Sequence, residues 1–117
     1  MLKGILRIRF TPIAPKGNGY YNAAEITYLQ IKFDDDLYFV GFLRGSKERD
    51  QYFFDEEYEV EVVFPSINRE VYEMLENKIN SNFAFPICLG KLVIGTTYFN
   101  SCEYLDTLGS NRNPFRN

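Results

Sequence analysis

A glycine turn followed by a long apolar run, residues 88–99, limits the folds that this chain can adopt. Alternate residues of an extended backbone point to opposite faces, and both faces of this run carry mostly apolar or small side chains. We therefore predict a strand that is buried on both sides. Gly95, in the middle of the run, has no side chain to pack and indicates a sharp bend or the close approach of another segment. Closing a sheet into a barrel requires such bends, so this run is predicted to be a central barrel strand.

Other runs show the two-residue period of a strand, at residues 2–10, 24–33, 37–43 and 57–64, and a short aromatic run follows at 51–54. Prolines and glycines in residues 11–19 and the three aspartates at 34–36 interrupt pairing and predict a loop and a turn. In the last alternating run, Glu57, Glu59 and Glu61 share one face. We interpret that face as the solvent side of the strand, protecting a sheet edge.

One interval, residues 66–79, has helical spacing instead, and Ser66 or Asn68 can cap it. Its apolar positions recur three or four residues apart and predict a buried stripe of Val71, Met74, Leu75 and Ile79. The chain is thus predicted to be mainly β. We expect a single antiparallel β-barrel of about six to eight strands with one short helix over residues 1–105, followed by a polar tail, residues 106–117.

Composition restricts the classes of partner. The chain has 117 residues, the size of one domain, and its 13 basic and 16 acidic side chains leave a net charge of −3. That charge gives no general attraction to phosphate backbones, so nucleic acid is disfavoured as a partner. Lys3, Arg7 and Arg9 interrupt any signal-peptide core, and no apolar run has transmembrane length. We therefore expect a cytoplasmic protein without membrane contact, in which Cys88 and Cys102 are buried, reduced thiols.

The chain has no histidine, which removes the commonest general base and the commonest zinc ligand. The carboxylates gather in turns, where they usually only interact with water. The turn of Asp34, Asp35 and Asp36 could hold a cation, but no calcium-loop spacing follows it. Cys88 is the one nucleophile to watch, because a cation such as Lys91 can activate a thiol; a buried, inert thiol is the expected state. We predict no enzyme activity and no cofactor.

A local basic cluster supplies the candidate partner-binding residues. Arg44, Lys47 and Arg49 are followed at once by an aromatic run that begins with Tyr52. Cations beside exposed aromatic rings can bind single-stranded nucleic acid by stacking. An aromatic strand after a charged loop more often returns to the core, and we favour that interpretation of the run.

Two segments carry a family resemblance. Residues 49–54, Arg-Asp-Gln-Tyr-Phe-Phe, and residues 90–97, Gly-Lys-Leu-Val-Ile-Gly-Thr-Thr, resemble strands of the C-terminal β-barrel of elongation factor Tu and of stand-alone bacterial proteins built on that barrel. Asp50 replaces the family's proline, and Thr97 stands where a second glycine is usual. The glycine-glycine-arginine loop that the family places near transfer RNA is not reproduced, since residues 34–36 are aspartates. The resemblance implies a barrel, but a fold alone does not fix a function.

These features favour a non-catalytic binding module whose partner is another protein, because exposed tyrosine and phenylalanine anchor interfaces. One alternative is an RNA-binding or translation-linked accessory role, suggested by the resemblance and the basic cluster. Another is an immunity-type toxin inhibitor, whose carboxylates would mask a basic toxin surface. The carboxylates considered for that role are Asp55, Glu56, Glu57, Glu59 and Glu61.

Overall fold

A computed structural model describes residues 1–11, 19–44 and 50–106. The barrel strands are β1 (Leu2–Phe10), β3 (Tyr28–Asp34), β4 (Leu37–Arg44), β6 (Glu57–Phe64), β7 (Phe85–Leu89) and β8 (Leu92–Tyr104). The other elements are β2 (Tyr20–Asn22), the 3₁₀-helix η1 (Ala23–Ile26), β5 (Gln51–Phe53) and the α-helix α1 (Arg69–Ile79). The predicted fold class, an antiparallel β-barrel with a short helix, is confirmed, with six strands in the closed barrel.

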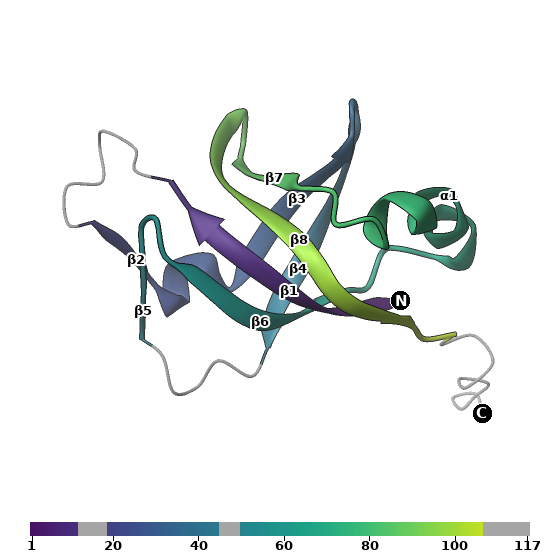
Figure 1. The fold of residues 1–117 in the computed structure, drawn as a ribbon, viewed down its shortest axis with the longest axis horizontal. Helices are drawn as coiled ribbons and strands as arrows, with labels where there is room; N and C mark the ends of the chain where they lie inside the picture. Colours follow the sequence, from purple (N-terminus) through teal and green to yellow (C-terminus); the bar gives the residue numbers. More distant parts are fainter. Residues whose placement is uncertain (12–18, 45–49, 107–117) are drawn as a thin grey trace.

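The strands follow one another around the barrel in the order β1-β6-β4-β3-β7-β8, and β8 returns to β1 (Figure 1). Every neighbouring pair is antiparallel. The contact between β3 and β7 is the shortest, with only Gln30↔Cys88 and Ile31↔Ile87 in register. Strands β2 and β5 form a separate two-stranded sheet at one end of the molecule, and α1 lies at the opposite end.

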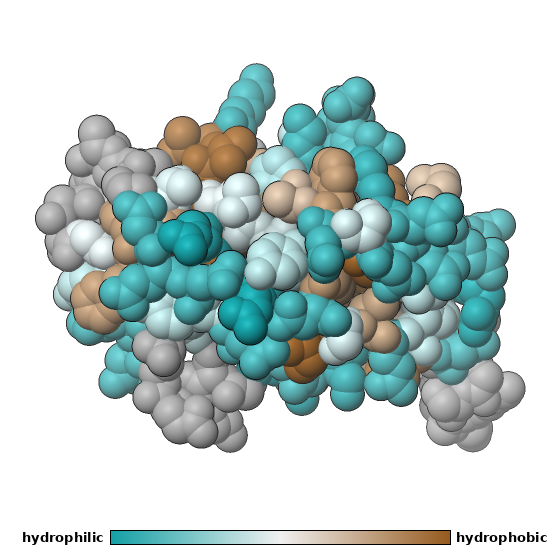
Figure 2. All heavy atoms as spheres, in the orientation of Figure 1, coloured by the Kyte–Doolittle hydropathy of each residue, from teal (hydrophilic) through white to brown (hydrophobic). Residues whose placement is uncertain are grey.

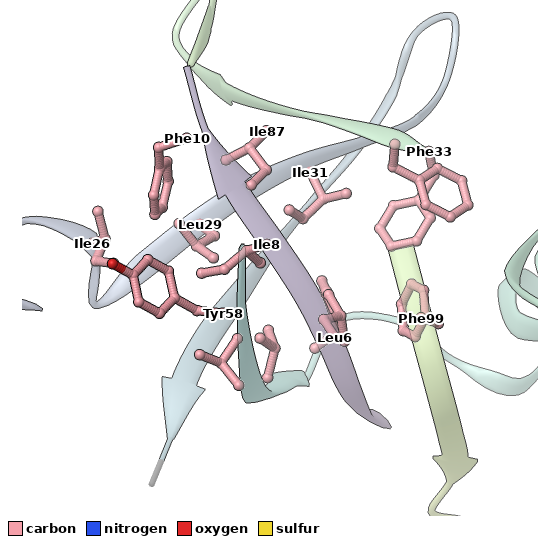
Figure 3. Close-up of a cluster of buried hydrophobic side chains, with 14 of the residues drawn as sticks. Leu6, Ile8, Phe10, Ile26, Leu29, Ile31, Phe33, Tyr58, Ile87 and Phe99 are labelled. Carbon is pink, nitrogen blue, oxygen red and sulfur yellow. The ribbon is translucent and has the colours of Figure 1, made fainter. Parts of the chain in front are cut away.

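The barrel is filled by the side chains that alternate inward along its strands (Figure 3). Leu6, Ile8 and Phe10 of β1 are fully buried, as the alternation predicted. Phe33 lies among four rings, with its centroid 4.9 Å from that of Phe85 and between 5.5 and 6.2 Å from those of Phe39, Phe64 and Phe99. This aromatic cluster occupies the part of the barrel that leads to α1.

Of the two predicted caps, Ser66 and Asn68, helix α1 uses Asn68, whose side chain accepts a hydrogen bond of 2.9 Å from the backbone N–H of Val71. Leu75 and Ile79 are buried beneath it. Met74, predicted to belong to the buried stripe, is 66% exposed, so that part of the prediction is wrong. The contact stripe follows the four-residue spacing from Val71 to Leu75 to Ile79, and Met74 lies about 100° away from Leu75 around the helix, toward solvent.

Strand β8 is buried on one side rather than two. Thr97 and Phe99 point inward and are buried, whereas Leu92, Val93 and Thr96 are exposed. The prediction of two-sided burial is wrong because the outer surface of the barrel is uncovered along this part of β8. The close approach inferred at Gly95 is confirmed, because a Cβ added there would overlap the carbonyl oxygen of Arg9.

Strand β6 alternates as predicted, and its inward side chains are all buried: Tyr58, Val60, Val62 and Phe64. The interpretation of its three glutamates as protection of a sheet edge is wrong. Strand β6 pairs with β1 along its whole length and with β4 near its C-terminal end, so it has a neighbour on each side. The glutamates instead contact basic side chains on β1 and, across β1, the Asn100 side chain on β8.

The run predicted as a strand over residues 24–33 begins with helix η1, and only Tyr28–Asp34 is extended. The Glu25 carboxylate accepts a 2.8 Å hydrogen bond from the backbone N–H of Asn22, which stabilises the helical turn. Ile26 is thereby turned into the core. Strand β2 was not predicted, and β5 pairs with it outside the barrel.

Candidate functional site

The outer surface of the barrel carries a polar region over β1, β6 and β8, which we call the charged face: Lys3, Arg7, Glu57, Glu59, Glu61 and Asn100. The Arg7 guanidinium lies 3.1 Å from the Glu57 carboxylate, and the Lys3 amine lies 4.0 Å from that of Glu61. Asn100 donates a 2.9 Å hydrogen bond to Glu59. Exposed pairs of this kind contribute little to stability. They mean, however, that each of the three glutamates already contacts a side chain of its own chain.

A second region of the outer surface, on β3, β4, β7 and β8, has the opposite character. We call it the apolar face, and it consists of Tyr28, Val40, Phe42 and Val93; the exposed pair Leu89 and Leu92 lies beside it at the tip of the β7–β8 hairpin, on the other side of that ribbon. Tyr28 is 67% exposed, Leu89 63% and Val40 44%. Hydrophobic side chains gather visibly over the β7–β8 hairpin in Figure 2. Adjoining exposed apolar side chains are uncommon on a monomer and mark interaction surfaces.

Strand register relates the two hairpins that carry the apolar face. Tyr28 pairs with Phe42, and their rings lie edge to face with centroids 5.0 Å apart. One row then crosses four strands, because Val40 pairs with Gln30, Gln30 with Cys88, and Cys88 with Val93. Cross-strand partners lie on the same face of a sheet, so the exposed Val40 and Val93 share the outer face, separated by the half-buried Gln30 and the buried Cys88.

Both ends of the β3–β4 hairpin carry charge. Arg44 is exposed at the end of β4, and Asp35 and Asp36 form the exposed turn at the other end. Near that turn, the Lys32 amine lies 6.0 Å from the ring centroid of Tyr38. The apolar side chains of the hairpin therefore lie between an acidic turn and a basic strand end.

The structure places the sequence-predicted partner-binding residues in different environments. Arg44 is exposed and borders the apolar face, whereas Lys47 and Arg49 lie outside the described residues. Tyr52 is completely buried, with ring centroids 5.0 Å from Tyr58 and 6.4 Å from Phe10. The assignment of Tyr52 to a binding surface is therefore wrong, and its role is to join the β2–β5 sheet to the core.

The apolar face was missed because residues 92–99 were predicted to be buried on both sides and because no side of residues 37–43 was assigned to solvent. A usable signal was present in β4, where Tyr38, Val40 and Phe42 alternate with Phe39, Gly41 and Leu43. Both faces of this strand are apolar, and a six-stranded barrel encloses only one of them. The other face must then be exposed or covered by a partner.

A depression of about 220 Å³ lies between the end of β3, α1 and β7. Lys78 spans it, donating a 3.1 Å hydrogen bond to the carbonyl oxygen of Phe33 and lying 3.6 Å from the Asp34 carboxylate. Asp34 also accepts a hydrogen bond from the backbone N–H of Asp35. These contacts tie α1 to the barrel. Across residues 1–11, 19–44 and 50–106 there is no group of three or more side chains able to hold a metal ion.

The two cysteines are free thiols, and Cys88 is buried. Cys102 is half-buried, and its sulfur lies 3.9 Å from the Tyr72 hydroxyl and 4.0 Å from the Asn80 side-chain oxygen. Burial raises the pKa of Cys102, and the nearby Glu76 carboxylate raises it further, although the Tyr72 hydrogen bond opposes this shift. Burial likewise raises the pKa of Tyr72. A raised pKa keeps Cys102 in the less reactive thiol form.

We therefore expect slow alkylation of both cysteines in the folded protein, measured by mass spectrometry after iodoacetamide treatment. Cys102 should react appreciably only above the pH at which an ordinary thiol ionises, and Cys88 only after unfolding. Because folding raises the pKa of Cys102, its contribution to stability is present at neutral pH and is lost as the pH rises through that raised value. Rapid labelling of native Cys88 at neutral pH would contradict this expectation.

No protein-family model, curated protein or solved structure matches this chain. The segments that resemble the elongation factor barrel lie in different parts of the fold. Residues 51–53 form β5 in the two-stranded sheet, and residues 92–97 belong to β8 after the Gly90 turn. Within the part of the chain that the structure describes, no helix has both the length and the apolar character needed to cross a bilayer.

Proposed function

We propose that this chain is a non-catalytic module that binds another protein molecule through the apolar face. The observation that carries the proposal is the cluster of exposed and half-buried apolar and aromatic side chains on the outer side of the β3–β4 hairpin, which includes Tyr28, Val40 and Phe42. Tyr28 and Phe42 suit the centre of an interface, because aromatic rings bury a large area at a small cost in conformational entropy. Truncating such anchors typically lowers affinity the most.

The contrast with the charged face supports this choice of surface. Three of the carboxylates considered for binding a basic toxin, Glu57, Glu59 and Glu61, already face Arg7, Asn100 and Lys3. Using them against a partner would require these contacts to be exchanged. An immunity-type inhibitor is therefore less well supported than a module that docks through the apolar face.

An RNA-binding role is the second candidate, and one observation favours it. Tyr28, Tyr38 and Phe42 lie on one face with Lys32 and Arg44, which combines stacking surfaces with cations. The net charge of −3 and the acidic turn beside these cations oppose phosphate binding. We therefore place this role second. The free thiols fit a reducing cytoplasmic location, which we retain as part of the proposal.

Site-specific photo-cross-linking in the native cell tests the proposal. A photo-reactive phenylalanine analogue at position 28 should cross-link a defined protein, whereas the same analogue at position 59, on the charged face, should not. The cross-linked protein is then purified, and its binary dissociation constant is measured with the unmodified chain and with Tyr28→Ala and Val93→Asp. Each substitution should weaken binding at least about tenfold, as expected at an interface anchor.

Two results would contradict the proposal. Equal cross-linking from positions 28 and 59 would show that the apolar face is not the contact surface. Saturable, salt-sensitive binding of transfer RNA that is lost in Tyr28→Ala would replace the protein partner with RNA. Glu59→Gln is the matched control in both binding assays, because it changes an exposed side chain outside the apolar face.

A further inference from the structure

We propose that the partner of the apolar face is a second copy of this chain, docked antiparallel across the β3–β4 hairpin. This inference rests on the proposed function, because it assigns an occupant to the same face. Most soluble homo-oligomers are two-fold symmetric dimers, in which one self-complementary patch meets itself. The outer face of the hairpin has the order of side chains that such a patch requires.

The centre of the patch is apolar and its ends have opposite charges. Along β4 and its turn, Val40 lies four residues from Arg44 in one direction and four residues from Asp36 in the other. Figure 1 shows that the turn and the end of β4 lie on opposite sides of the molecule. Among the described residues, neither Arg44 nor Asp36 forms an ion pair, and both are exposed. Asp36 is therefore available to a partner, and Arg44, which pairs in register with Glu61 of β6, has no salt bridge among the described residues that it would have to break.

A two-fold axis in the interface, passing across the Gln30 and Val40 pair, reverses the strand direction. Val40 of one copy then lies against Val40 of the other, and each Arg44 faces the other copy's Asp36. The alternative axis, along the strands, would place Arg44 near Arg44 and Asp36 near Asp36. Like charges at an interface disfavour an arrangement, so the charge pattern selects the antiparallel one.

The intermediate positions are also complementary. Lys32 and Tyr38 are cross-strand partners on one side of the centre, and Tyr28 and Phe42 are partners on the other. The antiparallel axis brings each Lys32 and Tyr38 pair over the partner's Tyr28 and Phe42 pair, which permits cation–π and ring–ring contacts. Sheets that pack face to face with nearly aligned strands allow such contacts along the full hairpin.

Sedimentation velocity over a range of concentrations, with the full chain, measures the predicted dimer. Val40→Asp should give a monomer, because the two-fold axis places two carboxylates together. Thr96→Asp is the matched control, since it puts the same side chain at an exposed position of β8. Circular dichroism checks that each variant remains folded, which we expect because Val40 is on the outer surface.

Charge reversal tests the antiparallel arrangement itself. Arg44→Asp and Asp36→Arg should each raise the dimer dissociation constant about tenfold, because each acts at two symmetry-related contacts. The double variant Arg44→Asp/Asp36→Arg should restore dimerisation. A chain that is monomeric at all concentrations, a dimer unaffected by Val40→Asp, or a charge swap without restoration would overturn the inference. If a monomeric chain still cross-links a different protein from position 28, the second copy is excluded and the proposed function stands.

Discussion

Replacing Gly95 with alanine will destabilise the protein by about 3 kcal/mol, measured by chemical denaturation. A Cβ at this position would overlap the carbonyl oxygen of Arg9 and lie 3.1 Å from the Cα of Phe10. Both atoms belong to the backbone of β1, which pairs with β8 and cannot move aside as a flexible side chain can. The substitution therefore forces the two strands apart where they close the barrel.

Gly90→Ala is the matched control for this experiment. Position 90 also favours glycine, because its backbone φ is +62°. A Cβ added there, however, would have no neighbouring atom within 4 Å. Its loss should cost only about 1 kcal/mol, the penalty of a left-handed backbone in an alanine. Gly95 does not have a positive φ, so a loss no larger than that of Gly90→Ala would mean that the close approach of β1 does not determine the need for glycine at position 95.

Phe33→Ala should destabilise the protein by about 3 to 5 kcal/mol, because it removes a buried ring and leaves a cavity among four others. Tyr28→Ala, on the outer side of the same strand, should cost less than about 1 kcal/mol. Thermal and denaturant unfolding of both variants provide the comparison. Phe33→Leu retains part of the volume of the ring. Its smaller loss of stability can be measured if the alanine variant does not fold. Similar losses at the two positions would mean that the two faces of β3 are wrongly assigned.

Much of this barrel can be predicted from sequence, because the alternation of side chains along a strand depends on only two environments, the core and the solvent. Where one face is polar, as in β1 and β6, the pattern identifies the buried side chains directly. The start of α1 is also local, because the Asn68 side chain bonds to the backbone three residues later. Such features do not require knowledge of the rest of the fold.

Strand β4 shows where this reasoning fails. Its outer side chains, Tyr38, Val40 and Phe42, are at least as apolar as the inner set that contains Gly41. Gly41 lies on the inner side, where a Cβ would overlap the Val62 side chain, and only the assembled barrel reveals this close contact. Pattern alone cannot choose between two apolar faces, and the candidate site lies on the face that the pattern does not identify.

The β2–β5 pairing was also beyond sequence reasoning. Each strand has three residues and pairs with a segment about thirty positions away, too little for a periodic signal. Two predictions for Tyr52 competed. The argument that aromatic strands return to the core was correct, and the argument from its position after a basic cluster was wrong. Burial, which depends on tertiary structure, decides between the two.

The closing seam of the barrel has a consequence for the order of folding. Strand β1, the first of the barrel strands, has β6 and β8 as its neighbours, and Leu105 donates a backbone hydrogen bond to Met1. During synthesis, β1 therefore has no neighbouring strand until β6 has been made, and it lacks its second neighbour until β8 has been made. A nascent chain that stops before β8 exposes one edge of β1 and the inward side chains Leu6 and Ile8. The exposed edge of such a chain can pair with other molecules. We therefore expect incomplete chains of this protein to aggregate more readily than complete ones.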